Sequence, residues 1–66
     1  MTMSPSRRRA VRRMLRAIDA GTEWRASWET IDAAITAGLC VYVPGNGYAA
    51  PGTGYTLTDD GRAFIR

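Results

Sequence analysis

The chain has 66 residues, a formal net charge of +3 and a hydrophobic content of 45%. This length allows one domain with one small core, and the hydrophobic content excludes an intrinsically disordered segment. One cysteine and no histidine exclude an internal disulfide and a zinc site of cysteine and histidine ligands. We therefore expect a single domain over residues 1–66 that binds no metal and no cofactor. A homodimer or a docked partner would add stability to so small a core.

Positive charge is concentrated in the first part of the chain. Residues 1–25 contain seven arginines and two carboxylates, a net +5, whereas residues 26–66 contain two arginines and four carboxylates, a net −2. No apolar run reaches the roughly 18 residues that span a bilayer, which predicts a cytoplasmic protein without a membrane partner. All nine basic residues are arginine, a bias that fits a GC-rich genome and a small phage product. A phage-encoded protein would act in the cytoplasm of its bacterial host.

The first predicted element is a helix that follows a short flexible lead over residues 1–6. It should begin near Ser6 or Arg7 and run to Ala20, and Gly21 supplies the left-handed position that commonly ends a helix. Its apolar residues follow the i, i+3, i+4, i+7 spacing of one helical face. These residues are Ala10, Val11, Met14, Leu15, Ala17 and Ile18.

An arginine cluster covers the rest of this predicted helix. A guanidinium stays charged and can form paired hydrogen bonds with a phosphate or a carboxylate. Such a density exceeds what solubility alone requires, so the cluster predicts an acidic partner, either nucleic acid or an acidic protein surface. The candidate binding residues are Arg7, Arg8, Arg9, Arg12, Arg13 and Arg16, of which Arg9, Arg12, Arg13 and Arg16 lie opposite the apolar face.

A second helix should follow a short connector. Residues 22–26 are too few for a full helix and should place Trp24 on the core. Ser27 is a suitable N-terminal cap for a helix that runs to Ala37. Its predicted apolar stripe consists of Trp28, Ile31, Ala34 and Ile35, and its outer face of Glu29, Asp32, Ala33 and Thr36. We expect both tryptophans to be core anchors, although a tryptophan left exposed here would make a good hot spot for a protein contact.

The periodicity then changes to that of a β-hairpin. Val41-Tyr42-Val43 and Tyr55-Thr56-Leu57 are β-branched and aromatic runs that predict two strands, joined through a glycine-rich turn that contains Asn46-Gly47. Pro51 should interrupt a regular ladder between them. We expect the tyrosines, Tyr48 among them, to pack across the strands rather than to stack on bases.

Two further expectations concern the rest of the core. Cys40 lies in an apolar setting, which is typical of a small buried hydrophobe. Thr58 should cap a short C-terminal helix with Asp59 and Asp60 in its first turn, where carboxylates are favoured by the helix dipole. On that helix, the residues expected to close the core are Ala63, Phe64 and Ile65.

The segment from Tyr55 to Arg62 resembles the strand-to-helix junction of winged-helix proteins, where an aromatic-x-Leu-Thr-x-x-Gly pattern closes the wing. Ala37-Gly38-Leu39-Cys40 is similar to the step between their recognition helix and first wing strand. The resemblance covers residues 28–66. It implies an α+β fold, a reduced winged-helix-like domain with two main helices, a β-hairpin wing and a short C-terminal helix. A usual winged helix has three helices before the wing, and here the middle one is reduced to a turn around Trp24 or lost.

The charge of the two helices bears on function. The helix that reads DNA in winged-helix proteins offers Glu29 and Asp32 here and no basic residue, so it would repel phosphate. Binding would then rest on the first helix, with Arg25 and Tyr48 as secondary contacts, and would give affinity rather than sequence specificity.

Two functions fit this pattern. The first is a small DNA-associating accessory or regulatory protein. The second is a protein-interaction module, for example a phage factor that docks its arginines or aromatic residues onto a host protein. An enzyme is not expected, because no carboxylate is paired with a base, a nucleophile or a pocket.

Overall fold

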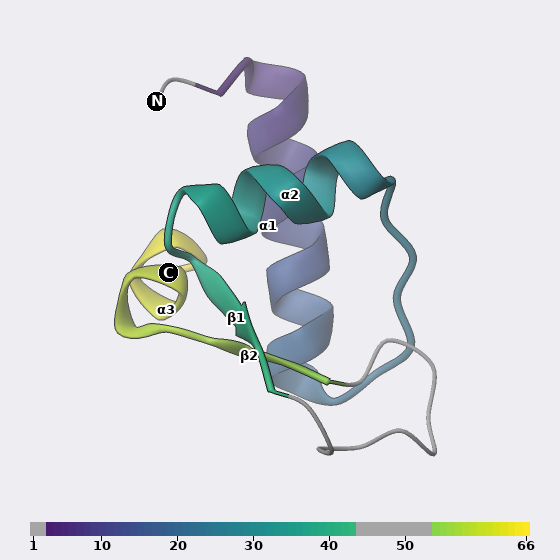
Figure 1. Ribbon diagram of the computed structural model, residues 1–66, viewed down its shortest axis with the longest axis vertical. Coiled ribbons are helices and arrows are strands. Elements are labelled where there is room, and N and C mark those ends of the chain that lie inside the picture. Colours follow the sequence, from purple (N-terminus) through teal and green to yellow (C-terminus); the bar gives the residue numbers. More distant parts are fainter. Residues whose placement is uncertain (1–2, 44–53) are drawn as a thin grey trace.

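The computed structural model describes residues 3–43 and 54–66 and has an α+β architecture (Figure 1). This fold class confirms the expectation from the sequence, as do the two main helices, the hairpin and the short C-terminal helix. The described elements are α1 (Pro5–Ala20), α2 (Trp28–Thr36), β1 (Cys40–Tyr42), β2 (Tyr55–Leu57) and α3 (Asp59–Phe64).

Both ends of α1 follow from local chemistry. The Oγ of Ser4 accepts a hydrogen bond from the Arg7 amide at 3.1 Å, and Pro5 occupies the first turn, where its missing N–H costs nothing. The helix therefore begins earlier than Ser6, and the predicted flexible lead is too long at its C-terminal end. As expected, Gly21 ends the helix in the left-handed region, with φ 72°.

The core lies where α2 and the hairpin cover the same side of α1 (Figure 1). From α1 it receives the predicted apolar face, which is buried at Val11, Met14 and Leu15. These side chains pack against one residue from α2 and three from the segments around the hairpin: Ala34, Leu39, Cys40 and Leu57. One side of α1 is thus fully used by the core, and the other remains at the surface.

The burial of α2 differs from the prediction at Trp28 and Ile35, which are exposed, and at Ala33, which the sequence places on the outer face but which is partly buried against the core. Trp28 is 69% exposed, so the expectation that it anchors the core is wrong, and Ile35 at its other end is 38% exposed. The side that faces α1 carries the small residues Thr30 and Ala34, which are both buried. Two residues correspond to about 200° around a helix, so Trp28 must point outward once Thr30 points inward.

Trp24 behaves as the sequence predicts. It lies in the connector between α1 and α2, is partly buried and packs against the core. Its ring meets the edge of the Tyr55 ring in a T-shaped pair, with 5.9 Å between centroids. The connector contains no helix, so the chain passes from α1 to α2 without the middle one of the three helices that precede the wing in a usual winged helix.

The hairpin pairs β1 and β2 in an antiparallel register, with Cys40 opposite Leu57 and Tyr42 opposite Tyr55. The two tyrosine rings lie 5.3 Å apart, which confirms the expected cross-strand packing for this pair. Cys40 is fully buried, and this burial raises the pKa of its thiol. It is the small buried hydrophobe that its setting predicted. Tyr48, Pro51 and the predicted turn lie outside the described residues.

The junction between β2 and α3 shows why threonine and glycine occur three residues apart. The Thr58 Oγ1 accepts from the Gly61 amide at 3.0 Å and donates to the Gly38 carbonyl at 2.6 Å. The Thr58 amide donates to the Leu39 carbonyl at 3.1 Å. A Cβ on Gly61 would overlap that same carbonyl oxygen, so only glycine lets α3 approach so closely.

The rest of α3 matches the prediction except at one residue. Asp59 and Asp60 lie in the first turn, and Phe64 and Ile65 are partly buried against the core. Ala63 is exposed, so the expectation that it closes the core is wrong. It lies two residues after Gly61, which faces Leu39, and therefore points to nearly the opposite side of this short helix.

Candidate functional site

Arg7 is used inside the protein. Its guanidinium donates to the Thr30 Oγ1 and, at 3.4 Å, to the Ser27 Oγ. Those two hydroxyl oxygens lie 3.0 Å apart, and the Ser27 Oγ also caps α2 by accepting from the Thr30 amide at 3.2 Å. Arg7 thus ties the first turn of α1 to the N-terminal cap of α2 and supplies a partner for the buried Thr30 hydroxyl.

A second group of arginines faces α3. The guanidinium carbons of Arg8 and Arg12 lie 5.4 Å and 5.2 Å from the centroid of the Phe64 ring, within cation–π range. Arg16 donates to the Ile65 carbonyl at 3.4 Å. These three side chains hold the C-terminal residues against one flank of α1.

Arg9 and Arg13 lie on the side of α1 that points away from the core. Both are exposed, and they are one turn apart. Together with Arg12 and Arg16 they line an open hollow of about 330 Å³ whose walls are arginine side chains alone. We call this surface, formed by Arg9, Arg12, Arg13 and Arg16, the arginine hollow.

The arginine hollow has no internal counter-charge within residues 3–43 and 54–66. The ion pair found in these ranges joins Arg62 to Asp59 on α3 at 3.1 Å, and none involves an arginine of α1. The guanidinium groups of the hollow therefore keep most of their hydrogen-bond donors for solvent or a partner, each able to form a fork with an oxyanion.

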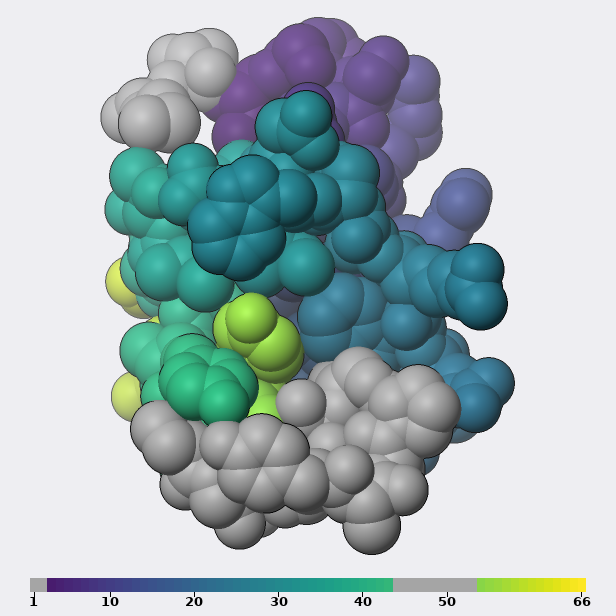
Figure 2. All heavy atoms as spheres, turned by 45° about the vertical axis from the view of Figure 1, so that its right-hand side comes forward, coloured from purple at the N-terminus to yellow at the C-terminus, as the bar shows by residue number. Residues whose placement is uncertain are grey.

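The outer surface of α2 has the opposite charge. Glu29 and Asp32 are exposed there beside Trp28, and this helix contains no basic residue. In Figure 2 the α2 surface (teal) is continuous with that of the strands (green). This arrangement agrees with the sequence expectation that α2 presents carboxylates rather than base-reading side chains.

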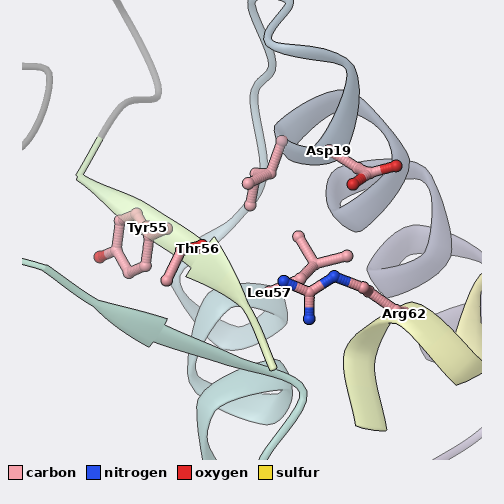
Figure 3. Close-up of a pocket in the computed structure, with 6 residues that line it drawn as sticks. Asp19, Tyr55, Thr56, Leu57 and Arg62 are labelled. Atoms are coloured by element: carbon pink, nitrogen blue, oxygen red, sulfur yellow. The ribbon is translucent and has the colours of Figure 1, made fainter. Parts of the chain in front are cut away.

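A small pocket lies between α1, β2 and α3 (Figure 3). Its volume is about 150 Å³, below the roughly 300–1,000 Å³ typical of small-molecule sites. Asp19 and Arg62 contribute its charged groups, and Arg62 is already paired with Asp59. The arginine hollow is therefore the stronger candidate site.

Two further findings concern residues 3–43 and 54–66, the part of the chain that the structure describes. None of its helices combines the length and apolarity that crossing a bilayer requires. It also holds no group of three or more histidine, cysteine, aspartate or glutamate residues placed to bind a metal ion. Comparison of the chain with protein-family models, with curated proteins and with solved structures found no match.

The structure separates the predicted binding residues into distinct sets. Arg9 and Arg13 are at the surface, and Arg12 and Arg16 share the hollow with them while also contacting α3. Arg25 is exposed on the connector between α1 and α2, and Tyr48 lies outside the described residues.

Sequence reasoning missed the internal role of Arg7, although a signal was present. Arg7 precedes Val11 by four residues and Met14 by seven, so it lies on the buried side of α1 at the end where α2 begins. An arginine on the apolar side of a short helix predicts a buried hydroxyl or carboxylate partner.

Proposed function

We propose that this chain is a small, non-enzymatic DNA-associating accessory or regulatory protein with a reduced winged-helix-like fold. It binds through the arginine hollow of α1, whose guanidinium groups contact backbone phosphates. The observation that carries the proposal is a hollow lined by four arginines with no carboxylate partner in the described part of the chain. Phosphate suits such a set of forked donors, since, like a carboxylate, it accepts two hydrogen bonds from a guanidinium.

The length of the hollow sets the number of phosphates. Arg9 and Arg16 are seven residues apart, which corresponds to roughly 10 Å along the helix axis. One strand of a duplex carries a phosphate about every 3.4 Å of its axis, so the hollow reaches on the order of two to three phosphates. Contacts of this kind position a protein on DNA without reading its bases.

The surface of α2 supports a docking mode different from that of an ordinary winged helix. Glu29 and Asp32 are exposed on α2, so presenting that helix to the major groove would bring carboxylates towards phosphates. The opposite side of the helix pair carries the arginine hollow. DNA would therefore lie along α1, with α2 directed away from it.

A salt titration tests the proposal. Binding to a labelled duplex of about 20 base pairs, followed by fluorescence anisotropy, should weaken with a log-log slope of about −2 to −3. The double variant Arg9→Ala, Arg13→Ala should reduce that slope by about 2 and lower the affinity at least tenfold at low salt.

A matched control removes the same charge elsewhere. The double variant Arg62→Gln, Arg66→Gln changes the net charge equally, at exposed positions of the C-terminal segment, and should retain most of the affinity. Two results would contradict the proposal: no binding of the unaltered protein at about 25 mM salt, where phosphate contacts are strongest, or an equal loss of affinity in both double variants.

A second candidate function rests on Trp28. An exposed tryptophan is the side chain most enriched among energetic anchors of protein interfaces, and Trp28 is 69% exposed. The alternative is therefore a protein-interaction module, for example a phage factor that binds and modulates a host protein. Capture from nuclease-treated bacterial lysate should then yield a defined protein that Trp28→Ala loses and that Arg9→Ala, Arg13→Ala retains. A protein retained by both variants, or by neither, would count against this alternative.

A further inference from the structure

We propose that the protein associates with a second copy of itself, by inserting Trp28 of one copy into the arginine hollow of the next. Trp28, Glu29 and Asp32 form what we call the acidic knob, which is the exposed surface at the start of α2. The inference of self-association does not depend on DNA binding, because it is argued from the shape and charge of the two surfaces. One consequence, competition with DNA, rests on the function proposed above.

Size and chemistry match between the two surfaces. The hollow measures about 330 Å³ and is walled by four guanidinium side chains. An indole is the aromatic group that a cation binds best, and its flat faces can lie against guanidinium planes. The hollow is large enough for an indole, and the 69% exposure of Trp28 leaves most of that side chain accessible to a partner.

Charge complementarity surrounds the aromatic contact. Glu29 is adjacent to Trp28 in the chain, and Asp32 lies one helical turn after it on the same side of α2. Both carboxylates are exposed and would meet Arg9 and Arg13 at the rim of the hollow. Paired contacts between guanidinium and carboxylate fix register and speed association.

One copy cannot make this contact with itself. The knob lies on the side of α2 opposite its buried residues, Thr30 and Ala34, and the hollow lies on the side of α1 opposite its own buried face. The contact must therefore join two molecules. Because the knob and the hollow lie on opposite sides of the helix pair, two copies cannot make the contact reciprocally. The contact is therefore head-to-tail and gives a ring or an open chain rather than a two-fold dimer.

Sedimentation velocity of the intact protein tests the inference. At about 25 mM salt, the apparent mass should rise with concentration above the monomer mass of 7.2 kDa, and it should return to that value at about 500 mM salt. Trp28→Ala should weaken the association at least tenfold. A wild-type protein that remains monomeric at low salt up to several hundred micromolar would overturn the inference.

Charge reversal gives a test that does not depend on loss of association alone. One variant, Glu29→Arg with Asp32→Arg, reverses the knob, and another, Arg9→Glu with Arg13→Glu, reverses the hollow. Each alone should stay monomeric, whereas an equimolar mixture should associate, because the reversed knob meets the reversed hollow and the two unaltered surfaces meet each other. A misfolded variant could not produce this rescue. A mixture that stays monomeric while circular dichroism shows both variants helical would overturn the inference.

The alternative arrangement predicts a different outcome. A symmetric dimer formed by α2 against α2 would bury Trp28 and Ile35 without the arginines, so reversing Arg9 and Arg13 would leave it intact. Association that survives this change therefore overturns the knob-in-hollow contact. Saturating duplex should dissolve the wild-type assemblies if DNA occupies the same arginines. If the protein does not bind DNA, the self-association remains, so the two proposals fail separately.

Discussion

The side of α1 that faces α2 and the side that faces away from the core both carry arginine, and they use it differently. On the inner side, Arg7 donates to the hydroxyls of Ser27 and Thr30 and joins two helices. On the outer side, Arg9 and Arg13 form no ion pair within the described residues and border an open hollow. The flank between them directs Arg8 and Arg12 onto Phe64. Position around the helix, rather than residue type, therefore decides whether an arginine stabilises the fold or is free for a partner.

The largest effect on stability should come from a substitution that displaces α3 from the core. Gly61→Ala places a Cβ against the Leu39 carbonyl, which belongs to the backbone and cannot rotate away. We expect a loss of about 3 kcal/mol in the free energy of unfolding, measured by urea denaturation.

Gly21→Ala is the matched control for this change, because a Cβ there meets nothing within 4 Å and only the positive φ is unfavourable. It should cost about 1 kcal/mol. Equal costs at the two glycines would show that the close approach of α3 to Leu39 does not matter for stability.

The second-largest effect on stability should come from replacing Arg7, the arginine on the inner side of α1. Arg7→Ala removes two hydrogen bonds from a charged donor and leaves the buried Thr30 hydroxyl with Ser27 alone. We expect unfolding to become easier by about 2 kcal/mol. Arg9→Ala, two residues further along the same helix, should change stability by no more than about 0.5 kcal/mol. For DNA affinity we expect the reverse order, with the larger loss in Arg9→Ala. A larger loss of affinity in Arg7→Ala would contradict the division of α1 into an inner side that stabilises the fold and an outer side that binds DNA.

The contact between α1 and Phe64 of α3 can be weakened without changing the charge of the protein. Phe64→Leu keeps an apolar side chain against the core but removes the ring that Arg8 and Arg12 contact. The two cation–π contacts together should account for about 1 kcal/mol of stability, detectable as a lower midpoint of thermal unfolding. If the contacts matter, Arg8→Ala in the Phe64→Leu background should cost less than in the wild type. Strictly additive losses would show that the ring and the guanidinium are not coupled.

The smallest effect should come from neutralising α2. Glu29→Gln with Asp32→Gln removes two exposed carboxylates on the far side of the helix pair from the hollow. Because salt screens charges at such distances, duplex affinity should rise only about twofold to threefold at low salt. The same variant should weaken self-association, and affinity and assembly would thus move in opposite directions. A much larger rise, of about tenfold or more, would instead place α2 at the DNA, because the repulsion removed would then act at close range.

The local elements of the fold could be predicted well from the sequence. The caps at Ser27 and Thr58 and the left-handed stop at Gly21 depend on interactions within a few residues, and each occurs as expected. The apolar face of α1 was also identifiable, because Val11, Met14 and Leu15 repeat with the helical period. The density of arginines likewise indicated the candidate site before any geometry was known.

What the sequence by itself determined was therefore the set of elements, the buried side of α1 and the concentration of positive charge on that helix. Only the tertiary structure decided which arginines are free and which tryptophan is buried. Trp28 belongs to the apolar stripe of α2, yet the small residues Thr30 and Ala34 face α1 and turn Trp28 outward. Arg7 likewise faces inward because α2 places the Ser27 and Thr30 hydroxyls beside it. The physical reason is that periodicity fixes the angles between side chains on one helix, whereas the packing of a second helix fixes which angle points inward.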